Sequence, residues 1–185
     1  IAELRASDAV HATFTELTVE GASPTEVVRQ VSRMAGRPVV LENLAHQVLA
    51  VDPADQDLAA VLGDWEGRSR AVRTGARTGY DESSGWLVTT VGARGQDWGR
   101  LLLRTDAPPT PRDTMLVERG AATVALARLV ERDRESLERQ THRTLITGVI
   151  AGSVPLPELV ARASALGVPL EGRALVAVLV RLTRG

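Results

Sequence analysis

The sequence predicts an α+β fold, in which helices flank an antiparallel sheet and a long connector helix follows. Three observations predict this fold. Apolar residues recur at helical spacing near the N-terminus, two later regions have the pattern of β-hairpins, and one helical pattern continues for about 40 residues after Thr110. The chain has 185 residues, 44% of them hydrophobic, which is enough apolar surface for one well-formed core.

Two helices are expected before the first strand. Apolar side chains gather on one helical face over residues 1–20, and Gly21 ends that helix. A second helix begins after Ser23, because Ser23 and Glu26 have the spacing of a capping box. Gly36 provides its C-terminal stop. Its buried stripe is expected to consist of Val27, Val28, Val31, Met34 and Ala35.

Two hairpins supply the strands of the predicted sheet. The first joins residues 39–41 to residues 47–51, which are short runs of β-forming residues. The second joins residues 86–91 to residues 98–104 across a turn at 93–96. Between the hairpins we expect a helix with apolar residues from Leu58 to Val72, and then a loop with a short strand around Tyr80. Gly63 and Gly67 weaken that helix.

The last helical pattern is too long for one small core. It begins at a cap formed by Thr110 and Asp113 and continues to Ile150, which at ~1.5 Å per residue is roughly 60 Å. Residues 131–139 are highly charged but keep helix propensity. A further helix from Leu156 and an apolar strand over 174–180 follow. We therefore expect three parts: a domain over 1–130, a connector over 131–152, and the start of an incomplete α/β domain over 153–185.

Composition excludes several classes of function. The 22 basic residues are all arginine, and with 23 acidic residues they give a net charge of −1. A free-standing nucleic-acid binder usually carries a basic excess, so any DNA contact belongs outside this chain. The absence of cysteine excludes disulfides, thiolate nucleophiles and sulfur-ligated metals. No apolar run is long enough to span a membrane and no signal peptide is recognisable, so we expect a cytoplasmic location. A chain that starts at Ile1 and stops after an apolar strand has the features of a fragment.

The order of the predicted elements resembles a GAF-type sensory domain, which has a ligand pocket on one face of a small antiparallel sheet. The junction over 143–167 and the strand over 174–182 resemble the PucR-like bacterial transcription regulators, of the purine catabolism and sugar-diacid type. Residues 34–43 are similar to the entry into the sensory domain of that family. The residues that carry the match at the junction are Arg162, Ala163, Leu166 and Gly167. The resemblance implies a degenerate GGDEF-like domain after the connector and a helix-turn-helix at the far C-terminus, outside this chain.

Four residues are candidates for ligand binding: Trp65, Tyr80, Trp86 and Thr90. Aromatic residues make up only 3% of the chain, and a small-molecule pocket needs a few flat walls. Thr90 alternates with apolar neighbours on a predicted strand. The competing interpretation is that the aromatic residues belong to an ordinary core.

Catalytic and metal sites are not expected. His11, His46 and His142 are too far apart in the sequence to share a helical turn, so we predict no metal and no cofactor. The aspartates from Asp52 onward do not form a calcium-binding loop. Its sixth position requires glycine and holds Asp57, and its twelfth requires glutamate and holds Gly63. The serines of residues 83–85 lack a nucleophile-elbow motif, and residues 23–38 favour a core helix over a helix-turn-helix. We therefore predict that the chain is not an enzyme.

The functional hypothesis combines ligand sensing with dimerisation. Val130, Leu137 and Thr144 lie at heptad spacing and suggest a seam between two copies of the connector helix. An unknown small-molecule effector would shift the populations of two conformations, and the long helix would transmit that shift to the distal DNA-binding part. The alternative is a dimerisation module without a ligand. Neither the effector nor the sign of regulation can be inferred from the sequence.

Overall fold

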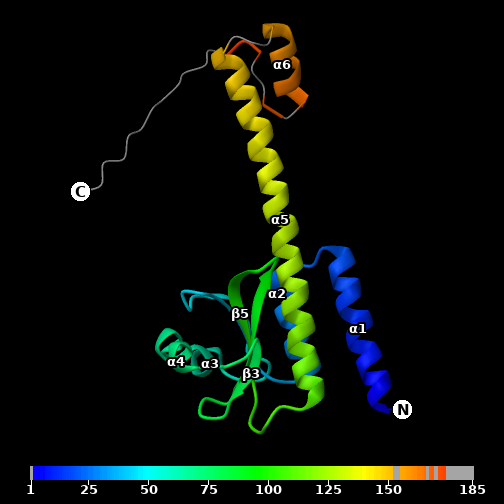
Figure 1. The fold of residues 1–185 in the computed structure, drawn as a ribbon, viewed down its shortest axis with the longest axis vertical. Coiled ribbons are helices and arrows are strands. Elements are labelled where there is room, and N and C mark those ends of the chain that lie inside the picture. The colour runs from blue at the N-terminus through cyan, green and yellow to red at the C-terminus, as the bar shows by residue number, and fades with distance from the viewer. Residues whose placement is uncertain (1, 152–154, 166, 169–170, 174–185) are drawn as a thin grey trace, which may run out of the picture. The chain divides into compact units, whose positions relative to one another are not determined.

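The computed structural model describes residues 2–151, 155–165, 167–168 and 171–173 (Figure 1). The chain divides into two compact units, residues 1–131 and 132–185, and each is described by itself. The strand predicted over 174–180 lies outside the described residues. The subdivision of the C-terminal part into a connector and an incomplete domain therefore stays a prediction.

The first unit holds a five-stranded antiparallel sheet with helices on both faces, so the predicted α+β class is confirmed. The strand order is β2-β1-β5-β4-β3. The strands are β1 (Val39–Asn43), β2 (Val48–Asp52), β3 (Thr78–Asp81), β4 (Trp86–Ala93) and β5 (Gln96–Arg104). The helices that begin in this unit are α1 (Ala2–Glu20), α2 (Pro24–Ala35), α3 (Leu58–Leu62), α4 (Trp65–Ala71) and α5 (Pro111–Ala151).

Local sequence signals explain the start and the end of α2. The Ser23 side chain accepts a hydrogen bond from the Glu26 amide, and the Glu26 carboxylate accepts one from the Ser23 amide, which completes the predicted capping box. The Ser23 amide and hydroxyl hold the pKa of Glu26 below its ordinary value, because both donate to its ionised form. Gly36 ends the helix with φ +65°, a left-handed conformation that glycine adopts without steric cost.

Both predicted hairpins are present. In the second, Arg94 and Gly95 form a two-residue turn, and both have positive φ, as the right-handed twist of paired strands favours. The two hairpins meet where β1 pairs with β5, with Leu41 opposite Leu101 and Glu42 opposite Arg100. This central pairing joins segments nearly 60 residues apart, so it depends on tertiary packing rather than on local sequence.

Side chains alternate between two apolar layers on the sheet. One face is covered by α1, α2 and α5, and its core includes Phe14, Val31 and Leu101. The other face is covered by α3 and α4 (Figure 1). Its apolar core is smaller and consists of Val40, Val61, Trp65, Val72, Trp86, Val88 and Leu102. We call the second surface the α3–α4 face.

The single helix predicted from Leu58 to Val72 is wrong, because the structure has two short helices there. Gly63 ends α3, and Asp64 takes a left-handed φ of +47° that no continuous helix allows. The break turns α4 so that Trp65 and Ser69 are both buried against the sheet.

α5 spans 41 residues without interruption, which confirms the predicted long helix after the sheet. Its first turn is closed by Thr110 and Asp113, whose side chains each accept a hydrogen bond from the other residue's amide. Asp113 also pairs with Arg37, just before β1. In the second unit, α6 (Leu156–Ala165) is followed by Gly167 at φ +73°, as expected for a C-terminal stop. None of the helices in the described part is sufficiently long and apolar to cross a bilayer.

α5 approaches the sheet closely at Gly120. A Cβ atom at this position would lie 2.6 Å from Cγ2 of Val31 and 3.1 Å from Cδ2 of Leu101. Both neighbours are completely buried, so they have little room to move. Glycine at this position therefore sets the distance between α5, α2 and the sheet.

We predict that Gly120→Val lowers the free energy of unfolding by about 3 kcal/mol through overpacking. Urea unfolding followed by circular dichroism measures the loss. Gly75→Ala is the matched control, since a Cβ there meets no atom within 4 Å. Equal effects of the two substitutions would contradict the close packing at Gly120.

Candidate functional site

The α3–α4 face carries a buried polar cluster. We call it the Glu42 cluster; its members are Glu42, His46, Trp65, Ser69 and Arg100. Strand register creates its centre, because Glu42 on β1 lies opposite Arg100 on β5, and Arg100 lies opposite Thr90 on β4. Cross-strand neighbours on one face of a sheet are close enough for their side chains to interact.

Glu42 is the most deeply buried member, with a side chain 0% exposed. Its Oε1 atom accepts a hydrogen bond from Arg100 Nε at 2.7 Å and lies 2.6 Å from Arg100 Nη2 in the same ion pair. Burying a carboxylate is costly unless it is paired and hydrogen-bonded. Arg100 supplies the compensating charge, since arginine stays protonated in proteins.

The second oxygen of Glu42 is bound by α4. Trp65 Nε1 donates to Oε2 at 2.8 Å, and Ser69 Oγ donates to the same atom at 2.6 Å. The two residues are four apart, so they lie on the same face of the helix. The first and last turns of α4 are thus both joined to one carboxylate on the sheet.

Arg100 also binds the C-terminal end of α4. Its Nη2 donates to the Ser69 carbonyl at 2.9 Å, and its Nη1 donates to the Val72 carbonyl at 3.3 Å. The last carbonyls of a helix have no partner within the helix, and a cation there also interacts favourably with the helix dipole. Arg100 therefore serves both as the counter-ion of Glu42 and as a cap for α4.

His46 completes the cluster from the β1–β2 turn, where it has φ +63°. Its Nδ1 lies 2.9 Å from Arg100 Nη2 and 3.0 Å from Ser69 Oγ. Because a guanidinium can only donate, a hydrogen bond between Arg100 Nη2 and Nδ1 has Nδ1 as its acceptor.

The cluster does not have the geometry of a hydrolytic triad, although it contains serine, histidine and glutamate. In a triad one ring nitrogen of histidine contacts the serine and the other contacts the acid. Here the same atom, Nδ1 of His46, lies 3.0 Å from Ser69 Oγ and 3.4 Å from Glu42 Oε1. Ser69 is also buried, and its hydroxyl donates to Glu42. The arrangement pairs two buried charges and positions α4, and it does not activate a nucleophile.

The structure brings together three of the four predicted ligand-binding residues. Trp65 and Trp86 are both buried and meet edge to face, with ring centroids 5.4 Å apart. Thr90 lies on the same face of the sheet, beside Arg100. Tyr80 packs instead against the core on the opposite face. The rings of Trp65 and Trp86 therefore contribute to the core here, and ligand binding by these residues stays a prediction.

The predicted dimer seam is described only in part. Val130 is on α5 and its side chain is 61% exposed. The backbones of Leu137 and Thr144 belong to the same helix, but their side chains lie outside the described residues. Of the three histidines considered as metal ligands, only His46 is in the Glu42 cluster. No group of residues suited to hold a metal occurs in the described part of the chain.

Sequence reasoning missed Glu42, Ser69 and Arg100. A signal was present for Arg100, a charged residue within the predicted strand over 98–104 at a position that points toward a core. Glu42 directly follows the predicted strand over 39–41, and the structure extends that strand to Asn43. Their opposite charges could have suggested a pair. The pairing itself could not be inferred, because the sequence does not show that β1 lies beside β5.

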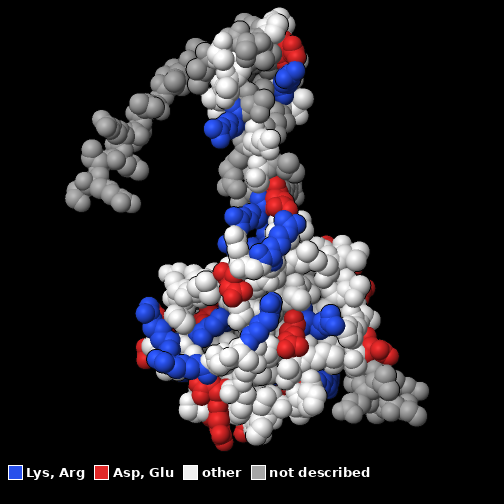
Figure 2. Space-filling view, viewed as in Figure 1, with Lys and Arg blue, Asp and Glu red and all other residues white. Residues whose placement is uncertain are grey.

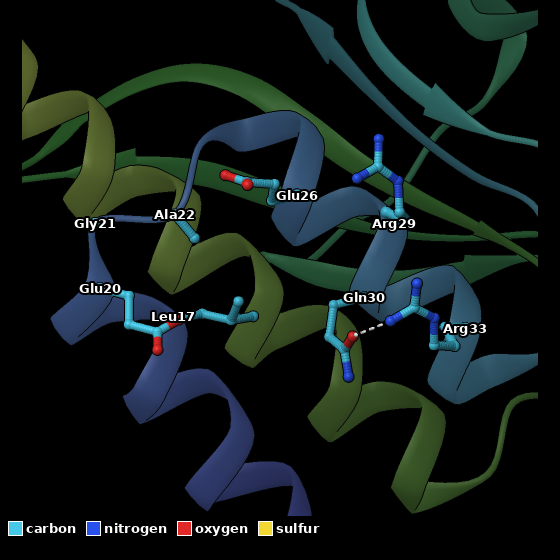
Figure 3. Close-up of a pocket in the computed structure, with 8 residues that line it drawn as sticks. All are labelled: Leu17, Glu20, Gly21, Ala22, Glu26, Arg29, Gln30 and Arg33. Carbon is cyan, nitrogen blue, oxygen red and sulfur yellow. Dashed lines mark hydrogen bonds between the residues drawn. The ribbon is translucent and has the colours of Figure 1, made fainter.

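Among the hollows on the described surface, two lie on the helical side of the first unit. One, of about 310 Å³, lies between the end of α1 and α2 and is lined by charged residues, including Arg29 and Arg33, over Leu17 and Ala22 (Figure 3). The other, of about 230 Å³, lies between α1 and α5. Arg33 donates to Gln30 at the edge of the first hollow. Both are open surface grooves, and neither includes a residue of the Glu42 cluster.

Among solved structures, the chain is similar to the GAF domain of a protein described as a sensor histidine kinase from Pseudomonas syringae pv. tomato. The TM-score is 0.51 and the sequences are 14% identical; the similarity covers 75% of this chain and 96% of that chain. The fold is GAF-like. No protein-family model and no curated protein matches the sequence.

We predict that Glu42→Gln destabilises the GAF-like domain by about 3 kcal/mol, because it leaves Arg100 without its counter-ion in a buried position. Chemical denaturation measures the change. Glu66→Gln is the control, since Glu66 forms an exposed pair with Arg70, and its loss costs less than about 1 kcal/mol. A Glu42 variant as stable as the Glu66 variant would show that the buried pair contributes little.

Proposed function

We propose that this chain is the sensory and dimerisation portion of a bacterial transcription regulator of the PucR-like type. In this proposal the GAF-like domain binds a small effector on the α3–α4 face, and α5 transmits the change toward a DNA-binding part outside the chain. The domain acts by binding and carries out no catalysis. The fold supports a sensory role, and the residues at the junction of the C-terminal part support the family.

The Glu42 cluster is the observation that carries the proposal. α4 is joined to the sheet through buried, charge-assisted hydrogen bonds at both of its ends. The strength of these hydrogen bonds depends on the distance between α4 and the sheet. A molecule that binds beside them therefore changes how firmly α4 is held. The rings of Trp65 and Trp86 are buried beside these bonds, so a shift of α4 would change their surroundings.

The sheet provides the route to α5. β1 and β5 carry Glu42 and Arg100 on one face and Leu41 and Leu101 on the other, where the core with α5 begins. Arg128 of α5 also lies over the ring of Trp98 on β5, 4.8 Å from its centroid. A ligand that binds one state of the α3–α4 face preferentially therefore shifts the state of α5 as well.

Charge does not favour a nucleic-acid interface on this unit. In the view of Figure 2, arginines and acidic residues are interspersed over the first unit, and the whole chain has a net charge of −1. A nucleic-acid surface requires positive charge gathered on one face. We therefore propose that DNA binding belongs to a part of the protein outside this chain.

Tryptophan fluorescence tests the sensing function. We expect an effector, found by thermal-shift screening of metabolites, to change the emission of the wild type and of Trp98→Phe, which keeps both tryptophans of the α3–α4 face. The double variant Trp65→Phe/Trp86→Phe retains only Trp98, which lies on the side of α5, and should keep no more than a smaller change. A screen in which no compound raises the melting temperature would refute effector sensing.

A second candidate function, dimerisation without a ligand, is favoured by exposed apolar residues on α1 and α5. Val19 is 82% exposed, and Leu126 and Val130 are exposed at successive turns of α5. Val19 and Leu126 line the same groove between the two helices. An apolar patch of this kind is typical of an interaction surface, and a second copy of the chain would extend the predicted seam at Val130.

We predict that Val130→Glu converts a dimer into a monomer, because the seam would have to bury two carboxylates without partners. Light scattering coupled to size-exclusion chromatography measures the mass. Leu58→Glu is the control, since Leu58 is an exposed leucine on α3, away from the seam. A wild-type chain that is monomeric at all concentrations would contradict dimerisation through this surface.

A further inference from the structure

If the α3–α4 face senses an effector, as proposed above, the groups that reach solvent there set the chemistry of that effector. Glu42 is completely buried, whereas the side chains of Arg100 and His46 are 17% and 22% exposed. The part of this charged group that solvent reaches therefore belongs to Arg100 and His46, and none of it to the carboxylate. These two groups are suited to an anion.

The hydrogen bonds of Arg100 show how an anion can be accepted. Its Nη2 atom carries two hydrogens, yet four acceptors surround it: Glu42 Oε1 at 2.6 Å, Ser69 Oγ at 2.7 Å, the Ser69 carbonyl at 2.9 Å and His46 Nδ1 at 2.9 Å. Only Glu42 is charged among them. Because charge-assisted hydrogen bonds are about twice as strong as neutral ones, a second carboxylate can displace the neutral acceptors.

The charge balance of the cluster involves His46. Glu42 and Arg100 neutralise each other, so a bound carboxylate would leave an unbalanced negative charge in a largely buried place. A proton on His46 restores neutrality. The charged groups that face His46 are Glu42 on β1, 3.4 Å away, and Arg100 on β5, 2.9 Å away, while α4 presents the uncharged Ser69. An anion between Arg100 and a protonated His46 also removes the repulsion between these two cations.

We propose that Arg100 and His46 bind the carboxylate of a small effector, and that binding is accompanied by proton uptake at His46. Glu42 keeps Arg100 Nε, while the Nη atoms exchange the carbonyls of Ser69 and Val72 for the carboxylate. α4 thereby loses its C-terminal cap when the effector binds. This makes α4 the element whose position reports the bound state.

The test compares small carboxylic acids with the corresponding amides and amines on the same carbon skeleton, using thermal shift and titration calorimetry on the full chain. We expect the acids to bind at least about tenfold more tightly than the amides. Calorimetry in buffers of different ionisation enthalpy should show proton uptake. The affinity should increase as the pH falls, because binding takes up a proton at His46.

Two variants separate the roles of the cluster residues. Arg100→Lys keeps a charge beside Glu42 but lacks the planar fork, and should weaken binding at least about tenfold. His46→Asn suits the positive φ of the turn and should remove the pH dependence and the proton uptake. Arg29→Gln, an exposed arginine of α2 on the other side of the sheet, is the control and should bind as the wild type does.

The outcomes distinguish this inference from the proposed function. If amides or amines bind as well as the acids, or if His46→Asn keeps the pH dependence, the carboxylate site is wrong although the domain still senses a small molecule. If Arg100→Lys fails to fold, the carboxylate site is still tested by His46→Asn and by the series of compounds on the wild-type chain. If no compound of any charge shifts the melting temperature, effector sensing fails, and this site fails with it.

Discussion

Glu42 is a carboxylate without access to solvent, and its burial constrains everything on the α3–α4 face. A buried carboxylate without a partner would take up a proton or would destabilise the fold around it. Arg100 therefore has to lie opposite Glu42, and Trp65 and Ser69 have to supply donors to its second oxygen. The register of β1 on β5 and the position of α4 both satisfy these requirements.

The same strands link the two layers of the domain. Along β1 and β5, polar residues of the Glu42 cluster alternate with leucines that pack beneath the long helix. At Gly120 that helix approaches the sheet without an intervening side chain. Closely packed interiors do not deform continuously, so a change on one face has to be accommodated on the other. This physical connection between the two faces is the basis of the proposed sensory role.

Local signals made most of the fold predictable. Ser23, Glu26 and Gly36 defined α2, because caps and left-handed stops depend on a few neighbouring residues. The turn at Arg94 and Gly95 defined the second hairpin for the same reason. The division into α3 and α4 was not predicted, because the apolar spacing continues across Gly63 and only the left-handed Asp64 interrupts the helix. Because aromatic residues are scarce, Trp65, Trp86 and Tyr80 were predicted to bind a ligand. Trp65 and Trp86 meet on the α3–α4 face. Tyr80 packs on the opposite face.

The sequence by itself determined the class of fold, most of the helix and strand boundaries and the long helix, because each of these follows from the periodicity and capping chemistry of contiguous residues. Only the tertiary structure decided the site. Glu42 and Arg100 are 58 residues apart in the chain, and their meeting depends on which strands become neighbours in the sheet. His46 and Ser69 join them from a turn and a helix that carry no mutual signal. Non-local strand pairing brings these four side chains together, and pairing between distant segments is decided by the packing of the whole domain.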